Sequence, residues 1–266
     1  MGKKKENRYS QIIEKIFFNN YQSGNKEVKF SRNEIVPVAK KLHIELPLNI
    51  GDVLYSFRFR SSLPTNITKL APAGYEWLIK LSGHAKYKFS LEKELKIIPN
   101  ESLIFTKILD STPGIINMYS LTDEQAILAI LRYNRLIDTF LGITCYSLQN
   151  HLRTTVPSLG QVETDEIYIG LDRRGAHYVI PVQAKGGKDK QGKVQIEQDL
   201  LMCGDKFSGL LCIPVAAQFM SDDKIALFAF ERDNDGLIKI QSERHYKLVP
   251  SDGLTISEIE SYNKRK

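Results

Sequence analysis

The chain has 266 residues, of which 42% are hydrophobic and 26% are charged. This composition excludes a mostly disordered protein, and the length suits one large domain or a core domain with a smaller companion. The weakly charged stretch 208–220 is shorter than the roughly 18 apolar residues of a membrane span. No apolar segment follows the basic start, and the three cysteines are widely spaced. We therefore expect a cytoplasmic protein with no membrane partner, no disulfide framework and no zinc site.

The formal charge of +6 is divided unevenly along the chain. Residues 1–120 contain 19 Lys and Arg against 11 Asp and Glu, whereas residues 121–266 contain 18 against 20. A basic half gains affinity for a polyanion such as nucleic acid through counterion release. The charge alone is equally compatible with an ordinary basic surface, so it does not decide between the two.

Three helices are predicted in the first 60 residues. Apolar residues recur at helical spacing over 9–17 and again over 35–42. A capping-box pattern at 31–34 precedes the second helix, but Pro37 would lie too deep if Ser31 were the cap, so Asn33 is an alternative cap. Asn49 is expected to cap a third short helix through 53–57, whose end exposes Arg58 and Arg60.

A β-hairpin is predicted after these helices. Segments 75–81 and 85–89 flank a glycine turn, and in the second segment aromatic residues alternate with Lys86 and Lys88. Helices followed by a basic hairpin resemble a winged helix-turn-helix, in which one helix enters the major groove and the hairpin touches phosphates. The resemblance implies DNA contacts from Arg58, Arg60, Lys86 and Lys88. The alternative is a packing subdomain with a half-buried hairpin.

The middle of the chain contains a second capping-box pattern, at 122–125. The apolar residues behind it predict one long core helix ending near Gly142. The polar run 149–155 is then expected to be a loop or a helix end, with phosphate contact as an alternative.

The most informative segment is a second predicted hairpin. The strand at 163–170 begins with Glu163, Asp165 and Glu166, a turn follows at 172–175, and the largely apolar strand 178–185 ends at Lys185. Residues i and i+2 of a strand share a face, so Gln183 and Lys185 project together. If Asp165 lies opposite, an acid, an amide oxygen and an ammonium group converge.

This set of groups matches what phosphodiester hydrolysis requires. A hard divalent cation needs carboxylate and carbonyl oxygens, and a positive group must offset the charge that develops at phosphorus. The alternative is an exposed hairpin with solvated charges. However, a lysine that ends an apolar strand is partly withdrawn from water, and this costs free energy unless its ammonium group has a functional role.

At these residues the sequence resembles the PD-(D/E)XK nuclease superfamily, and within it the type II restriction endonucleases. Their signature is an acid on one strand and (D/E)-x-K on the next; Asp165 matches the acid and Lys185 the lysine. Gln183 departs from the usual acid, so Glu163, Glu166 or Glu197 is left to compensate. The resemblance implies Mg²⁺ as cofactor, held by Asp165, Gln183 and Glu163. It also implies that Lys185 orients water or stabilises charge, and that Gln195 belongs to the site from the following helix.

The sequence thus predicts an α/β protein in which a mixed-sheet nuclease core follows a smaller winged-helix-like domain. We expect a DNA-binding domain at 1–95, a linker at 96–120 and the nuclease core at 121–266. The predicted activity is cleavage of double-stranded DNA by a homodimer, because cutting two strands symmetrically requires two sites, and a cognate methyltransferase is a possible partner. A non-catalytic DNA-binding regulator and a structure-specific nuclease are the alternatives.

Overall fold

The computed structural model describes residues 8–119, 124–157, 159–186 and 191–265. The chain has a mixed α/β fold and divides into two units. Unit 1 consists of residues up to 96 together with 154–162, and unit 2 consists of 97–153 and 163–266. Among the described helices, none is long and apolar enough to cross a membrane.

Unit 1 packs four α-helices against a three-stranded antiparallel sheet with the order β1-β3-β2. The apolar residues of the predicted helices and hairpin form one core, in which Phe17, Trp77 and Phe89 pack edge to face. The elements are α1 (Ser10–Asn20), β1 (Glu27–Ser31), η1 (Arg32–Glu34), α2 (Ile35–Lys41), α3 (Gly51–Phe59), α4 (Thr65–Thr68), β2 (Tyr75–Leu81) and β3 (Lys86–Lys93).

The three predicted helices and the predicted hairpin of unit 1 are present. Ser31 and Glu34 form the capping box, so the Asn33 alternative is wrong. The box caps the 3-10 turn η1 rather than α2, and this places Pro37 at the third residue of α2, where its missing N–H breaks no helical bond. The N-cap of α3 is Ile50, which has no side-chain cap, so the predicted cap at Asn49 is wrong; Asn49 Oδ1 instead accepts a hydrogen bond from the Gly51 backbone N–H at 3.1 Å just before the helix. Strand β1 was not predicted.

Unit 2 is built on a mixed sheet of eight strands. Its order is β4-β11-β10-β9-β7-β6-β5, with β8 paired to β7 as well. The strands are β4 (Phe105–Leu109), β5 (Thr144–Val156), β6 (Gly160–Leu171), β7 (His177–Lys185), β8 (Leu211–Cys212), β9 (Val215–Phe219), β10 (Lys224–Arg232) and β11 (Ile238–Val249). The helices are α5 (Gly114–Tyr119), α6 (Glu124–Tyr133), α7 (Leu136–Leu141), α8 (Lys193–Lys206) and α9 (Ile256–Asn263), and η2 (Ser221–Asp223) is a 3-10 turn.

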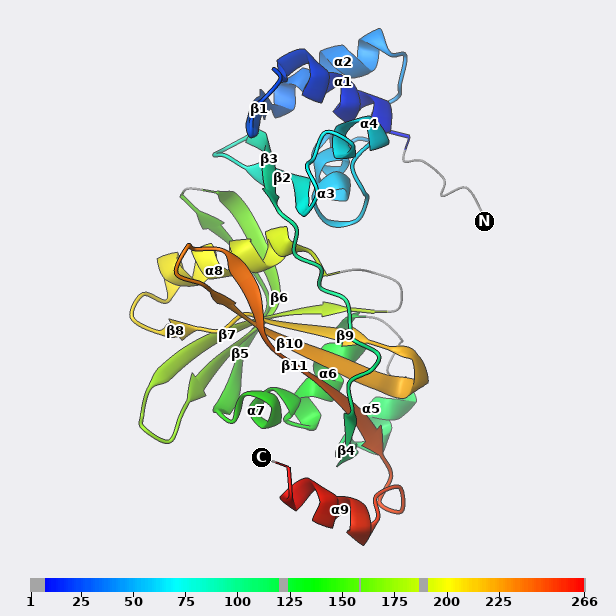
Figure 1. The fold of residues 1–266 in the computed structure, drawn as a ribbon, viewed down its shortest axis with the longest axis vertical. Coiled ribbons are helices and arrows are strands. Elements are labelled where there is room, and N and C mark those ends of the chain that lie inside the picture. The colour runs from blue at the N-terminus through cyan, green and yellow to red at the C-terminus, as the bar shows by residue number, and fades with distance from the viewer. Residues whose placement is uncertain (1–7, 120–123, 158, 187–190, 266) are drawn as a thin grey trace. The chain divides into compact units, whose positions relative to one another are not determined.

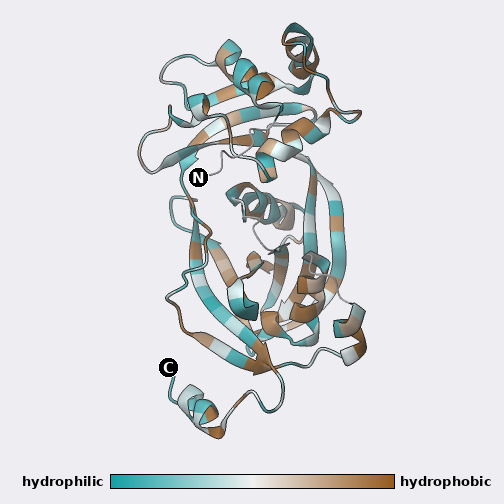
Figure 2. Cartoon of the chain, turned by 90° about the vertical axis from the view of Figure 1, so that its right-hand side faces the viewer, coloured by the Kyte–Doolittle hydropathy of each residue, from teal (hydrophilic) through white to brown (hydrophobic). Residues whose placement is uncertain are grey.

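Helices α6 and α8 lie on opposite faces of this sheet (Figure 1). Ile127, Leu128 and Leu131 of α6 share a core with Val182 and Ala184 of β7, whereas α8 contacts the intervening residue Gln183. Hydrophilic and hydrophobic residues are interspersed along the long strands (Figure 2), as expected where only part of each strand faces a core. Strand β7 is covered on both faces and is therefore apolar nearly throughout.

Three sequence predictions for unit 2 need correction. The long helix expected up to Gly142 is two helices, because Arg135 adopts a left-handed conformation with φ of 49° between α6 and α7. The run 149–155 lies within strand β5, not in a loop or helix end. The range 96–120, expected to be a linker, contains β4 and α5, and β4 pairs in parallel with β11. The capping box at 122–125 lies largely outside the described residues.

Candidate functional site

The predicted hairpin is formed by β6 and β7, which pair from Leu171 and His177 to Glu166 and Val182. Strand β7 is central, since β8 and β9 pair with its other edge in parallel. Pro181 falls between the stretches of β7 that pair with β8 and β9, where a missing N–H costs no bond on that side. The last regular pair of the two strands is Glu166 with Val182. Asp165 lies one residue outside this pairing, beside the carboxyl-terminal part of β7.

Asp165 is tied to β7 by its own side chain. Its Oδ2 accepts a hydrogen bond from the backbone N–H of Ala184 at 2.8 Å. The half-buried carboxylate thus lies beside the residue between Gln183 and Lys185. This agrees with the prediction that an acid from the first strand converges with the Gln-x-Lys pattern of the second.

Gln183 is 1% exposed and is held between β6 and α8. Its Nε2 donates to Thr164 Oγ1 at 3.2 Å and to the two carboxylate oxygens of Asp199 at 3.2 and 3.0 Å. Its Oε1 accepts from Gln195 Nε2 at 3.4 Å. The structure therefore brings Gln195 to Gln183, as predicted, and adds Asp199, which was not predicted from the sequence.

A helical signal for Asp199 was present in the sequence. Residues four apart on a helix are neighbours on its surface, so Gln195 and Asp199 share one face of α8. Glu197, two residues from Gln195, falls on a different side of the helix and is half-buried. The spacing i, i+4 would have favoured Asp199 over Glu197 as the acid beside Gln183.

Asp199 is 2% exposed, and its environment favours the protonated form. Burial raises the pKa of its carboxyl to about 8, and the nearby Asp165 carboxylate acts in the same direction. Hydrogen bonds from Gln183 and Thr164 favour the charged form but do not offset burial. Without a cation, this carboxyl therefore keeps its proton at neutral pH.

The raised pKa predicts an unusual pH dependence of stability. The unfolded chain loses this proton near pH 4 and the folded chain near pH 8, so the folded state binds more protons between these values. Stability should therefore fall as pH rises through this window and level off above it. Asp199→Asn cannot ionise and should be more stable than wild type at pH 8, by on the order of 2 to 4 kcal/mol. Urea denaturation in EDTA from pH 5 to 8.5 measures this difference.

Asp172 provides a matched control for the Asp199 variant. It lies in the turn of the same hairpin, and backbone hydrogen bonds, chiefly from Ala176, lower the pKa of its carboxyl to about 2. The Asp172 carboxylate stabilises the folded state at pH values above its unfolded-state pKa, and this stabilisation is lost on acidification. Its contribution to the pH dependence of stability therefore has the opposite sign to that of Asp199. Asp172→Asn should not stabilise the protein at pH 8. A flat profile for wild type between pH 5 and 8 would contradict the assignment for Asp199.

The other two acids at the head of β6 lie elsewhere. The Glu163 carboxylate accepts from Arg153 of β5 at 2.9 Å and lies 3.7 Å from His151 Nδ1; only its backbone carbonyl approaches Gln183, at 3.5 Å. Glu166 is opposite Val182, so its side chain projects from the face of the sheet opposite to Gln183. The idea that Glu166 compensates for Gln183 is therefore wrong, and Glu163 would first have to leave its ion pair.

The donor set suits a hard cation that takes oxygen ligands. In the described parts of the chain, no group of three His, Cys, Asp or Glu residues could hold a metal, so a cation here would use amide oxygens as well as carboxylates. The side-chain oxygens of Gln191 and Gln195 are buried and have no hydrogen-bond partner among the described residues. Together with Asp165 and Asp199 they offer the carboxylate and carbonyl oxygens that Mg²⁺ prefers.

Lys185 completes the pattern on β7. It is half-buried, two residues beyond Gln183, and opposite Gln218 of β9. A lysine in this position keeps its stem among neighbouring residues and its ammonium group near the surface. The hairpin therefore presents a positive group at the same end as Asp165.

The four predicted DNA-contact residues in unit 1 fall into two groups, the two arginines over aromatic rings and the two lysines on the hairpin. Arg58 lies over the rings of Phe59 and Tyr87, at 4.5 and 6.0 Å from their centroids. Lys86 and Lys88 alternate with the core residue Tyr87, so they project from the face of the small sheet that lies away from the core. On that face Lys88 pairs with Glu27. Arg60 stacks over Tyr55 at 5.1 Å.

Of these four side chains, Arg58 has the most unusual environment. Its Nε and Nη2 are buried without a hydrogen-bond partner in the described part of the chain. Burial lowers the pKa of Arg58 to about 10. Arg58 as a whole is half-buried, and a charge that is partly removed from water without a counter-charge is costly.

Comparison of this chain with family models, with curated proteins and with solved structures found no match.

Proposed function

We propose that the protein is a metal-dependent endodeoxyribonuclease that hydrolyses double-stranded DNA, in the manner of type II restriction endonucleases. One observation carries this proposal. Asp165 of β6, Gln183 of β7, and Gln195 and Asp199 of α8 meet at the end of the hairpin that also presents Lys185. Two acids, two amides and a lysine form the minimal set for holding a cation beside a phosphodiester.

In this proposal Asp165 and Asp199 would hold Mg²⁺ together with the amide oxygens of Gln183 or Gln195. When bound, Mg²⁺ supplies charge stabilisation at phosphorus and lowers the pKa of an attacking water. The Lys185 ammonium would offset the charge that develops at the scissile phosphate. Gln183 orients the Asp199 carboxyl through its two hydrogen bonds, so its role includes positioning an acid as well as offering an oxygen.

Unit 1 is proposed to bind the DNA backbone. The half-buried Arg58 and the exposed Arg60 and Lys86 support this, because basic side chains that reach solvent can donate to phosphate oxygens. Since both strands of a duplex must be cut, we further propose a homodimer with one site per strand. A restriction activity would also require a cognate methyltransferase to protect the host DNA.

Plasmid cleavage tests the proposed activity directly. The full-length protein is incubated with supercoiled plasmid in Mg²⁺ and in EDTA, and the ends of any fragments are sequenced. We expect linear products in Mg²⁺ only, with defined ends. Metal-independent DNA binding without cleavage would instead favour the non-catalytic regulator, and cleavage confined to branched or flapped substrates would favour a structure-specific nuclease.

Arg58 provides a prediction for the DNA-binding role of unit 1. Arg58→Met keeps the apolar contacts with Phe59 and Tyr87 but removes a half-buried charge, so stability at neutral pH should be unchanged or higher. DNA affinity should fall, and the slope of log affinity against log salt should decrease by about 0.9 for each phosphate that is no longer neutralised. Fluorescence anisotropy with a labelled duplex in EDTA measures both. A variant that is as stable as wild type and binds DNA equally well would exclude Arg58 as a DNA ligand.

A further inference from the structure

Two of the three cysteines lie on the face of the large sheet that α8 covers. All three are free thiols. Cys203 is on α8 and is 1% exposed, whereas Cys212 is on β8 and is half-buried. Neither residue has a part in the proposed metal site or in the proposed contact with DNA. Their positions follow from the spacing along the helix and from the register of the sheet.

The helical spacing places Cys203 on the side of α8 that faces the sheet. Residues four apart on a helix are neighbours on one face, so Gln195, Asp199 and Cys203 form one stripe. The first two members of this stripe contact Gln183 of β7. Cys203, the last member, therefore also points toward the sheet, in agreement with its burial.

The strand register places Cys212 on the same face of the sheet. Val179 of β7 lies four residues before Gln183, and residues at even separations on a strand share a face. Cys212 pairs in parallel with Val179, and directly paired residues of neighbouring strands point to the same face. The Cys212 side chain therefore faces α8, as the Gln183 side chain does.

The two thiols also lie at the same level along the strands, because α8 runs back along β7. From Gln195 to Cys203 the helix advances about 12 Å, at 1.5 Å per residue. From Gln183 back to Val179 the strand advances about 13 Å, at about 3.3 Å per residue. Since Gln195 contacts Gln183 at one end, Cys203 lies beside Cys212 at the other. Helix α8 packs against β8 there, and the Cys203 thiol hydrogen-bonds with the Cys212 side chain.

The two thiols differ in their access to an oxidant. The thiolate is the reactive form of a cysteine, and exposure decides which cysteine is oxidised first. Hydrogen bonding with Cys212 and burial raise the pKa of the Cys203 thiol, so this thiol stays protonated at neutral pH. Cys212 is the member of the pair that reaches solvent. An accessible cysteine with a second thiol beside it is the arrangement found in peroxide-sensitive cysteine pairs.

We propose that a peroxide oxidises Cys212 and Cys203 to a reversible disulfide, with Cys212 as the cysteine that reacts first and Cys203 as the resolving cysteine. In the first step the Cys212 sulfur attacks an oxygen of hydrogen peroxide; the S–O bond forms, the O–O bond breaks and water leaves. In the second step the Cys203 sulfur attacks the Cys212 sulfenic acid; the S–S bond forms and the S–O bond breaks. The hydroxyl group leaves as water with the proton of the Cys203 thiol. Two thiols thus give two electrons to one peroxide, and two waters are released.

This modification goes beyond the proposed nuclease function and does not depend on it. The disulfide would join the last turn of α8 to β8, one turn after Asp199 on the same stripe. Oxidation would therefore change the helix that carries part of the candidate metal site. Thiol counts and peptide masses detect the disulfide whether or not the protein cleaves DNA.

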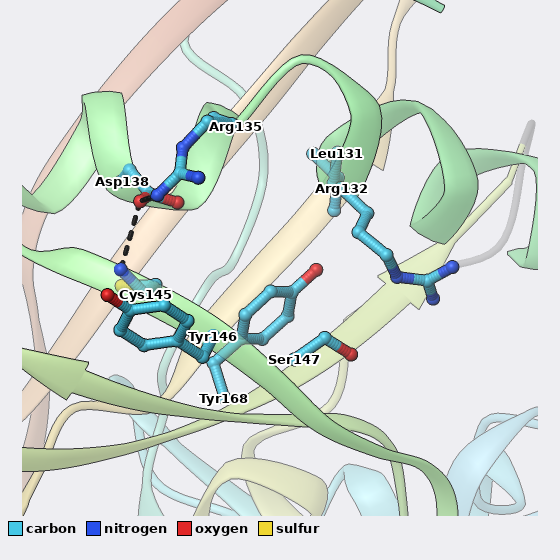
Figure 3. Close-up of a pocket in the computed structure, with 8 residues that line it drawn as sticks. All are labelled: Leu131, Arg132, Arg135, Asp138, Cys145, Tyr146, Ser147 and Tyr168. Atoms are coloured by element: carbon cyan, nitrogen blue, oxygen red, sulfur yellow. Dashed lines mark hydrogen bonds and ion pairs between the residues drawn. The ribbon is translucent and has the colours of Figure 1, made fainter. Parts of the chain in front are cut away.

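Cys145 provides a control within the same chain. It lies on the opposite face of the sheet, beside Asp138 and Tyr146 in the pocket between α6, α7, β5 and β6 (Figure 3). Its thiol donates to the Ile143 carbonyl at 3.3 Å, and burial raises the pKa of this thiol to about 12. The sheet separates Cys145 from the other two cysteines, so it should remain a thiol when they are oxidised.

The test uses the full-length protein, reduced and freed of reductant, with hydrogen peroxide as the oxidant. Free thiols are counted in denaturant after the reaction, and the alkylated protein is digested with trypsin without reduction. Trypsin cleaves after Lys206, so Cys203 and Cys212 fall on the separate peptides 194–206 and 207–224. Only a disulfide holds these two peptides together, and mass spectrometry detects the joined pair.

We expect the thiol count to fall from the three of the reduced chain to one, and dithiothreitol to restore it. The peptides 194–206 and 207–224 should be joined in wild type and in Cys145→Ser. Cys203→Ser should instead accumulate a sulfenic acid at Cys212, which dimedone labels.

The wild-type protein alone gives the thiol count and the joined peptides, so a variant that fails to fold does not remove the test. An unchanged thiol count, oxidation of Cys212 without the joined peptides, or a disulfide that links two chains on a non-reducing gel would overturn the proposal. A protein that forms the disulfide but cuts no plasmid would overturn the nuclease alone.

Discussion

Asp165→Asn is expected to reduce Mg²⁺-dependent DNA cleavage by about a thousandfold, because loss of a metal ligand commonly removes on the order of 4 kcal/mol of transition-state stabilisation. Asparagine retains an oxygen that can accept the Ala184 N–H bond, so the hairpin should remain intact. Duplex binding, which is proposed to depend on unit 1, should be within a few-fold of wild type. Single-turnover cleavage of a labelled plasmid and anisotropy in EDTA separate the two effects.

Asp172→Asn is the matched control for this experiment. It makes the same chemical change on the same hairpin, at the turn rather than at the end that holds Gln183. It should cleave at the wild-type rate. If Asp165→Asn cuts as fast as this control, Asp165 does not hold the cation and the site must be assigned elsewhere.

The second large effect is expected at Gln183, where the two substitutions should differ in their response to Mg²⁺. Gln183→Leu removes the donor to both Asp199 oxygens and should destabilise the protein by about 2 to 4 kcal/mol. Gln183→Glu places a second carboxyl beside a buried acid, and like charges disfavour ionisation of both. Its stability should therefore fall as pH rises, and Mg²⁺ should restore it.

Thermal denaturation of both variants with and without Mg²⁺ at pH 8 measures this difference. The Glu variant should gain more stability from Mg²⁺ than wild type, and the Leu variant should gain least. Gln198→Leu makes the same change at another buried glutamine, on α8, and should keep the wild-type response. Equal Mg²⁺ responses of the Leu variant and wild type would exclude the Gln183 oxygen as a ligand and leave it a positioning role.

Local patterns predicted many of the elements around the site. The hairpin of β6 and β7 was predictable because alternation, a turn signal and an apolar strand lie within one short stretch of sequence. The same holds for α1, α2 and the hairpin of β2 and β3. The helix break at Arg135 was not predictable, because no Gly or Pro marks it and the residue is held in place by its ion pair with Asp138.

The sequence by itself placed Asp165, Gln183, Lys185 and Gln195 in one neighbourhood, since short-range spacing on two strands and the next helix suffices for that. Only the tertiary structure decided which acid accompanies them. Glu166 and Asp199 are equally acidic in sequence, but strand alternation directs Glu166 to Arg132 on one face, while packing of α8 on the other face brings Asp199 to Gln183. The face that a carboxylate occupies depends on register and on which helix covers that face, and both are set by packing between residues far apart in the chain.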